Sequence, residues 1–161
     1  FAEYESMGLA AGHPIIRGIQ AEGAAPVAHM FATGSSELTP VQKPDTVATA
    51  IRIGNPANWK KTVRALKESG GGARSVSDKE ILGAQKALAK HEGIFAEPAG
   101  AAALAGLIKD LEEGLVDKSS EIVCVSTGHG LKDPDVAVTQ SSKPKVIEAT
   151  LDALKELLEA S

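Results

Sequence analysis

Cysteine and aromatic residues are nearly absent from the chain. It holds one cysteine, and aromatic residues make up 3% of its 161 residues. A lone Cys124 cannot form an internal disulfide, which is typical of proteins of the reducing cytoplasm. Its place in the apolar run 121–126 predicts a small buried side chain in a strand rather than a nucleophile or a ligand. With so few rings, a core has to be built from Ala, Val, Ile and Leu.

Basic stripes, long hydrophobic runs and metal-binding spacings are also missing. The net charge is −4 and no run of Lys and Arg forms a basic stripe, so nucleic acid is not indicated as a partner. The apolar stretches are far shorter than the roughly 20 residues that a membrane span needs. Neither His-Glu-x-x-His nor Cys-x-x-Cys is present, so the four histidines predict no metal site. A phosphate loop and a Gly-x-Ser-x-Gly elbow are absent as well.

What remains is ordinary globular composition, with 43% apolar and 24% charged residues. The length suits one domain with one core. The first residues, Phe1-Ala2-Glu3-Tyr4, resemble the inside of a helix and include no initiator Met. We therefore expect a fragment or a processed chain.

Alternating strand and helix signals predict an α/β domain with helices layered on a largely parallel sheet. Strands are expected over 15–20, 73–76 and 121–126, the last being a continuous apolar run of the kind buried on both faces. Helices are expected from Asn55-Pro56, from a capping box at Ser77-Asp78-Lys79-Glu80, from Pro98 and over 145–160. In the helix from Pro98, Leu104, Leu107, Ile108 and Leu111 are expected on one side.

The turn Thr127-Gly128-His129-Gly130 is the first candidate for ligand contact. It follows the strand expected at 121–126, and open α/β sheets bind ligands beyond the carboxyl ends of their strands. Its small residues allow close approach to the backbone, and Ser126 and Thr127 offer hydroxyls. An ordinary strand-to-helix turn explains the same residues, so spacing alone leaves both interpretations open.

Two charged residues are further candidates. Glu97 stands just before the helix that Pro98 opens, where a carboxylate is favoured by the helix dipole without any catalytic role. Arg52 lies in an apolar segment and is explained equally well by a structural ion pair or by a ligand site. Both alternatives stay open for each residue.

Three segments together resemble the second half of the threonine synthase family, pyridoxal-phosphate enzymes of the tryptophan-synthase-like (fold type II) group. They are Thr49-Ala50-Ile51-Arg52-Ile53-Gly54-Asn55-Pro56, Glu97-Pro98-Ala99-Gly100-Ala101-Ala102 and Thr127-Gly128-His129-Gly130-Leu131-Lys132-Asp133-Pro134. The resemblance covers about residues 1–135, a part of the cofactor-binding catalytic region. Residues 136–161 match only as a polar link and a C-terminal helix.

The resemblance implies a role for each matched position. Thr127 corresponds to the hydroxyl residue that bonds the pyridine nitrogen of pyridoxal 5'-phosphate, and Gly128 and His129 to the turn beneath the ring. Ala50 and Ile51 correspond to backbone that lines the cofactor pocket, and Glu97 to a carboxylate near the ring. The family's Schiff-base lysine, substrate-carboxylate loop and phosphate cup match nothing in this chain, so no catalytic residue is expected here and Lys132 is not that lysine.

The implied parent enzyme converts O-phospho-L-homoserine and water to L-threonine and phosphate. Its expected partners are the missing N-terminal portion and a small-molecule substrate, with a homodimer as the assembly and the cytoplasm as the compartment. Threonine dehydratase or another lyase of the fold group is an alternative, and so is a non-catalytic stand-alone domain. The chain alone is expected to be inactive.

Overall fold

The computed structural model describes residues 1–140 and 145–160. Its sheet has two parallel strands, β1 (Arg17–Ala21) and β2 (Gly72–Val76), with Arg17 opposite Gly72 and Ala21 opposite Val76. Both strands lie close to the positions expected from the sequence. Seven α-helices are described: α1 (Ala2–Ser6), α2 (Pro26–Thr33), α3 (Trp59–Glu68), α4 (Asp78–Ala87), α5 (Pro98–Glu112), α6 (Pro134–Gln140) and α7 (Leu151–Glu159). Short turns of tighter or wider helix are η1 (Glu22–Ala24), η2 (Thr49–Ile51), η3 (Leu88–Glu92) and η4 (Gly130–Lys132).

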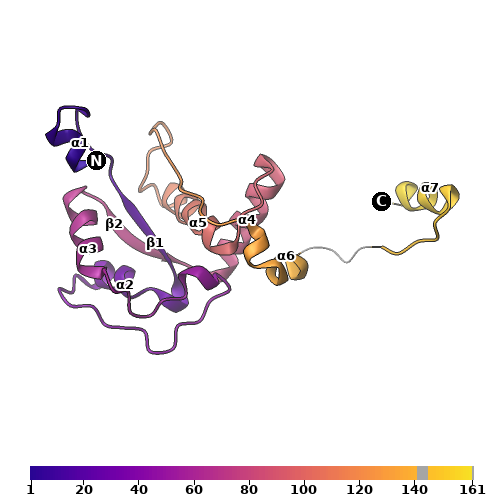
Figure 1. The fold of residues 1–161 in the computed structure, drawn as a ribbon, viewed down its shortest axis with the longest axis horizontal. Coiled ribbons are helices and arrows are strands. Elements are labelled where there is room, and N and C mark those ends of the chain that lie inside the picture. Colours follow the sequence, from indigo (N-terminus) through magenta and orange to yellow (C-terminus); the bar gives the residue numbers. More distant parts are fainter. Residues whose placement is uncertain (141–144, 161) are drawn as a thin grey trace.

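Helices cover both faces of the small sheet (Figure 1). A side chain at Gly18 would contact Leu66 of α3, whereas the neighbouring Ile19 lies against Gly106 of α5. Because successive residues of a strand point to opposite faces, α3 and α5 lie on opposite sides of β1. This layering is the α/β architecture that the alternating pattern predicts.

The core lies between the strands, α4 and α5, and consists of small residues. Its buried cluster contains only alanine, valine and isoleucine: Ala21, Ala48, Val76, Ile81, Ala84, Ala99, Ala101, Ala102 and Ala105. The expectation of a core without aromatic rings is thereby confirmed. The buried face of α5 consists mainly of alanine and glycine, because α4 and β1 approach it closely, and Leu104 packs partly buried against the cluster. Ile108 remains 39% exposed.

The capping box at the start of α4 forms as expected. The Ser77 hydroxyl accepts from the Glu80 N–H, and the Glu80 carboxylate accepts from the Ser77 N–H at 2.6 Å. The helix expected from Asn55-Pro56 begins instead at Trp59, one turn later, after Asn58. Residues 56–59 form a turn in which the Trp59 N–H bonds the Pro56 carbonyl at 3.3 Å.

Two expectations for the C-terminal third are wrong. Residues 121–126 form no strand; Val123 and Val125 are 84% and 69% exposed, and Cys124 is exposed rather than buried. A strand needs a neighbour for its backbone hydrogen bonds, and β1 and β2 pair only with each other among the described residues. In the tail, helix α7 begins at Leu151, with Thr150 as its N-cap, so 145–150 is not helical.

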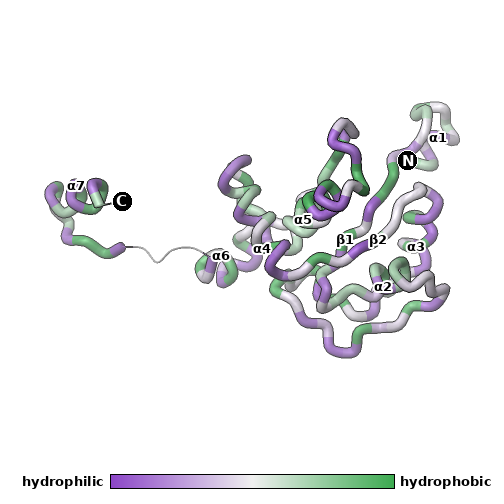
Figure 2. The backbone as a smooth tube through the Cα atoms, turned by 180° about the vertical axis from the view of Figure 1, so that it is seen from behind, coloured by the Kyte–Doolittle hydropathy of each residue, from purple (hydrophilic) through white to green (hydrophobic). Residues whose placement is uncertain are grey.

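Helix α7 stands apart from the other elements in Figures 1 and 2. The colours along it in Figure 2 alternate between hydrophobic and hydrophilic, as an amphipathic helix requires, and none of its residues is buried. None of the helices in the described ranges combines the length and apolar character that a membrane crossing requires.

Candidate functional site

The turn at 127–130 lies directly against the segment that leads into α5. The Glu97 N–H donates to the Gly128 carbonyl at 3.1 Å, and the Gly130 N–H donates to the Phe95 carbonyl at 2.9 Å. Ala96 and His129 form an isolated antiparallel bridge between these bonds. The backbone therefore brings Glu97 next to Thr127, Gly128 and His129, which the sequence singled out separately.

Two glycines make this close packing possible. Gly128 has φ +66°, and a Cβ there would lie 1.8 Å from Oε1 of Glu97. A Cβ at Gly100, in the first turn of α5, would lie 2.0 Å from the Thr127 carbonyl oxygen. Only glycine leaves this space and adopts the left-handed conformation of Gly128 without strain. The requirement explains why glycine stands at both positions.

Glu97 is buried at the N-terminus of α5. It is 4% exposed, and its side chain makes no capping hydrogen bond to the helix. Its partner among the described residues is Lys132, whose Nζ lies 3.6 Å from Oε1. A hydrogen-bonded cap therefore does not explain Glu97, although the helix dipole still favours a negative charge there.

The turn is also joined to η2, which carries Ala50 and Ile51. The Thr49 hydroxyl donates to Oδ2 of Asp133 at 3.0 Å, across 84 residues of sequence. Ala50 is exposed, and Ile51 packs on the buried core cluster. The structure thus brings η2, the N-terminus of α5 and the 127–130 turn together.

The side chains of Thr127 and His129 differ in their hydrogen bonding. Thr127 is exposed, and within residues 1–140 and 145–160 its hydroxyl makes no hydrogen bond. The His129 ring meets Phe95 edge-on, with centroids 5.3 Å apart, and its Nδ1 accepts from the Leu131 N–H at 3.2 Å. The Thr127 hydroxyl is therefore available to a ligand, while one nitrogen of His129 is already used to cap η4.

Arg52 does not join this site. It is exposed and forms no ion pair in the described part of the chain, so the structural ion pair considered for it is absent there. The buried ion pairs lie elsewhere, where Asp110 of α5 binds Arg74 of β2 and lies 3.4 Å from Arg17 of β1. These ion pairs hold α5 against the sheet. The Arg74 pKa is raised mainly by the hydrogen bond that its guanidinium donates to Glu113, with a smaller contribution from its hydrogen bond to Asp110.

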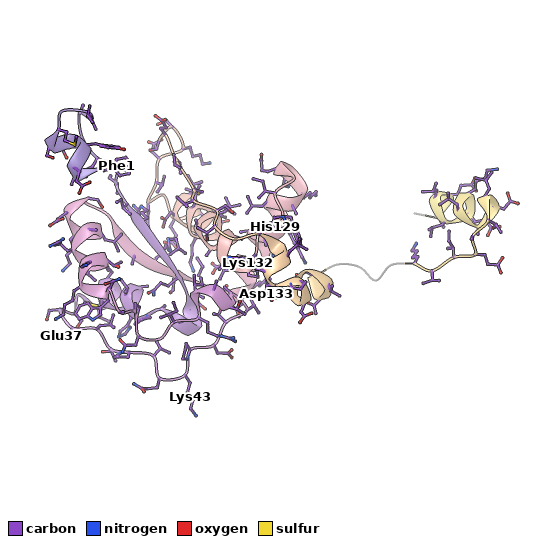
Figure 3. All side chains as sticks on the ribbon, viewed as in Figure 1. Phe1, Glu37, Lys43, His129, Lys132 and Asp133 are labelled. Carbon is purple, nitrogen blue, oxygen red and sulfur yellow. The ribbon has the colours of Figure 1, made fainter. Side chains whose placement is uncertain are left out.

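Sequence reasoning missed the two partners that close the site, Lys132 and Asp133. Figure 3 shows both beside His129, between α5 and α6. Their partners, Glu97 and Thr49, are distant in sequence, so no periodicity or local motif signals the contacts. Their position directly after the glycine turn was the only available indication.

Two hollows in the described residues lie away from the candidate site. One of about 430 Å³ lies between α3 and Ser36-Glu37, and one of about 270 Å³ lies by Arg17 and Arg74. Neither is lined by a residue of the candidate site. No group of three metal-binding side chains occurs in the portion that the structure describes. The groups that the site offers to a ligand are the hydroxyl of Thr127, the carboxylate of Glu97 and the backbone of Gly128.

Comparisons with known proteins add an independent line of evidence. The family model for pyridoxal-phosphate dependent enzymes matches residues 4–128. A threonine synthase of Methanocaldococcus jannaschii is 49% identical over 98% of this chain, and one of Methanosarcina acetivorans is 46% identical over 98%. The chain spans 39% of the length of each of these relatives.

Solved structures support the same fold. A threonine deaminase from T.th. matches 62% of this chain and 31% of its own, with a TM-score of 0.52 and 23% identity. Maize serine racemase matches 91% of this chain and 39% of its own, with a TM-score of 0.56 and 20% identity. At these identities the likeness concerns the fold alone.

Proposed function

The chain belongs to the family of pyridoxal-phosphate-dependent enzymes, and on that premise we propose that it is the C-terminal portion of a threonine synthase. The single observation that carries the proposal is identity of 45–49% to curated threonine synthases over nearly the whole chain. The proposed reaction of the complete enzyme converts O-phospho-L-homoserine and water to L-threonine and phosphate.

The residues present fit one wall of a pyridoxal-phosphate site. A pyridine nitrogen needs a hydrogen-bond partner, and the exposed Thr127 hydroxyl is uncommitted among the described residues. A flat ring needs a surface without bulky side chains, and Gly128 and Gly130 leave the turn bare. When bound, the cofactor supplies an electron sink for the reacting amino acid.

Each residue then has a defined task. Thr127 would donate a hydrogen bond to the pyridine nitrogen but, unlike a carboxylate, would not stabilise a full positive charge there. Backbone at Ala50 and Ile51 would line the cofactor pocket, and Gly128 and His129 would support the ring. Glu97 places a carboxylate beside that turn, where it orients groups near the ring.

The rest of the site is proposed to lie outside residues 1–161. The lysine that holds the cofactor covalently, the phosphate cup and the substrate-carboxylate loop are assigned to other parts of the complete enzyme. The exposed apolar residues of 121–126 would pack against those parts. We therefore propose that these 161 residues alone are inactive and that the complete enzyme acts as a cytoplasmic homodimer. Cell fractionation and light scattering test the last two points.

The test uses the complete gene product that carries this chain, loaded with pyridoxal phosphate. It is incubated separately with O-phospho-L-homoserine and with L-threonine. Phosphate release from the first, with threonine as product, is the expected result. Formation of 2-oxobutyrate from threonine without phosphate release would instead identify a threonine dehydratase. No turnover of either, with no bound cofactor, would indicate a non-catalytic protein.

A further inference from the structure

The Glu97 side chain is largely buried, and its carboxylate, which keeps some access to water, makes no hydrogen bond within the described residues. Its side chain is 5% exposed, yet the nearest charge in the described residues is Nζ of Lys132, at 3.6 Å. That separation is longer than a hydrogen bond. Buried carboxylates are costly unless they are paired and hydrogen-bonded. Among the described residues, Lys132 is therefore the one positive charge in reach of the Glu97 carboxylate.

Lys132 extends from a turn that is fixed on both sides. Before it, the His129 ring accepts from the Leu131 N–H at 3.2 Å within η4. After it, Asp133 accepts from Thr49 at 3.0 Å, which anchors the backbone to η2. The Lys132 side chain is 64% exposed, so much of it lies in solvent although its Nζ is near Glu97.

The other contacts of Glu97 give it no comparable restraint. The Glu97 carboxylate lies against the backbone of Gly128, so closely that a Cβ at that position would collide with it. Glycine has no side chain that could hold the carboxylate in place. Pro98 follows in the chain and has no N–H to donate. If the lysine charge were removed, the carboxylate would gain by turning toward water, away from the 127–129 turn.

We propose that Lys132 is a positioning residue that holds the Glu97 carboxylate against the Thr127–His129 turn. The inference rests on the proposed function, since it gives Glu97 its place beside the cofactor. Lys132 touches neither cofactor nor substrate in this proposal and acts through Glu97 alone. Its removal should therefore matter only while Glu97 is present.

A double-mutant cycle in the complete gene product tests this dependence. The variants are Lys132→Met, Lys132→Arg, Glu97→Gln and the double variant Lys132→Met with Glu97→Gln. Lys43→Met is the matched control, because Lys43 is exposed and lies on a distant loop (Figure 3). Each protein is stripped of cofactor and titrated with pyridoxal phosphate. Affinity, the absorbance and fluorescence bands of the bound cofactor, and the melting temperature without cofactor are recorded.

We expect Lys132→Met to weaken cofactor binding about five-fold and to shift the bands, the factor being that of one partly exposed ion pair. Lys132→Arg and Lys43→Met should match the parent. In the Glu97→Gln background, Lys132→Met should change affinity by less than about two-fold, because no charge remains to be held.

Equal losses in the two backgrounds would overturn the proposal, as would unchanged affinity and bands in Lys132→Met. A lower melting temperature with unaltered bands would reduce the contact to a structural ion pair. If the parent itself binds no cofactor, the proposed function fails first, and the inference with it. A parent that binds cofactor and releases phosphate while all variants behave alike refutes the inference alone.

Discussion

Replacement of Gly128 by alanine is the sharpest perturbation that the site offers. Gly128 has φ +66°, and a Cβ there would lie 1.8 Å from Oε1 of Glu97, 2.3 Å from its Cδ and 2.8 Å from its Cγ. The left-handed conformation costs alanine about 1–2 kcal/mol. Displacing the end of the flexible Glu97 side chain adds about 1 kcal/mol, the value of one partly exposed ion pair. The total loss of unfolding free energy should be about 2–3 kcal/mol.

Gly114 provides a matched control for the conformational part. It has φ +70°, and nothing lies within 4 Å of the Cβ position. Gly114→Ala should therefore cost only about 1–2 kcal/mol. Urea unfolding of both variants and the parent measures the difference, which reports the collision with Glu97. In a Glu97→Ala background, the cost of Gly128→Ala should fall to that of Gly114→Ala.

Because Glu97 must leave its place to admit a methyl group, Gly128→Ala should also weaken cofactor binding, and Gly114→Ala should not. Equal losses of stability in the two alanine variants would refute the reasoning. Such a result would mean that the Glu97 side chain does not rest on the turn.

Three further predictions concern hydrogen bonds. Thr127→Val should weaken cofactor binding by about 1 kcal/mol, measured by titration, because the pyridine nitrogen loses its donor; unchanged affinity and absorbance would assign Thr127 to the turn alone. Thr49→Val should cost about 0.5–1.5 kcal/mol of stability in urea unfolding, and almost nothing once Asp133→Ala is present. Burial alone would raise the pKa of Glu80, but hydrogen bonds from Ser77 and the nearby Lys109 bring it below its ordinary value. The stabilisation of the fold by ionised Glu80 is therefore fully present above the ordinary carboxyl pKa. Glu80→Ala should lower the unfolding free energy by ~0.5 kcal/mol at about pH 7, and this difference from the parent should vanish as the pH falls through the lowered pKa. A difference that persists in acid would contradict this.

Local signals in the sequence predict much of the fold. The spacing of Ser77 and Glu80 predicts the capping box, Pro98 marks the first residue of α5, and β1 and β2 lie within two residues of their expected bounds. Each of these depends on residues that are neighbours in the chain. The alternation of strands and helices likewise predicts the layers.

The errors arise where structure depends on distant partners. The run 121–126 has strand composition, but composition cannot supply the adjacent strand that its backbone needs. Which face of α5 is buried likewise depends on how closely α4 and β1 approach, and the spacing of its leucines does not predict that the alanines lie deepest. Asn55-Pro56 is a sound helix start by type, yet the chain forms a turn there and begins α3 at Trp59.

The candidate site divides in the same way. Motif resemblance singled out Thr127, Gly128, Glu97 and the segment with Ala50, and the structure brings these segments together. The contacts that join them, Lys132 to Glu97 and Thr49 to Asp133, cross long stretches of sequence. Side-chain pairing over such distances has no periodic signature. It becomes visible only once the chain is folded.

A crystal structure of the complete gene product with pyridoxal phosphate bound tests the central claim most directly. The account predicts that Oγ1 of Thr127 lies within hydrogen-bond distance of the pyridine nitrogen, above the bare backbone of Gly128. It also predicts that the lysine bonded to the cofactor lies outside residues 1–161. A cofactor bound away from the 127–129 turn, or bonded to a lysine of this chain, would contradict it.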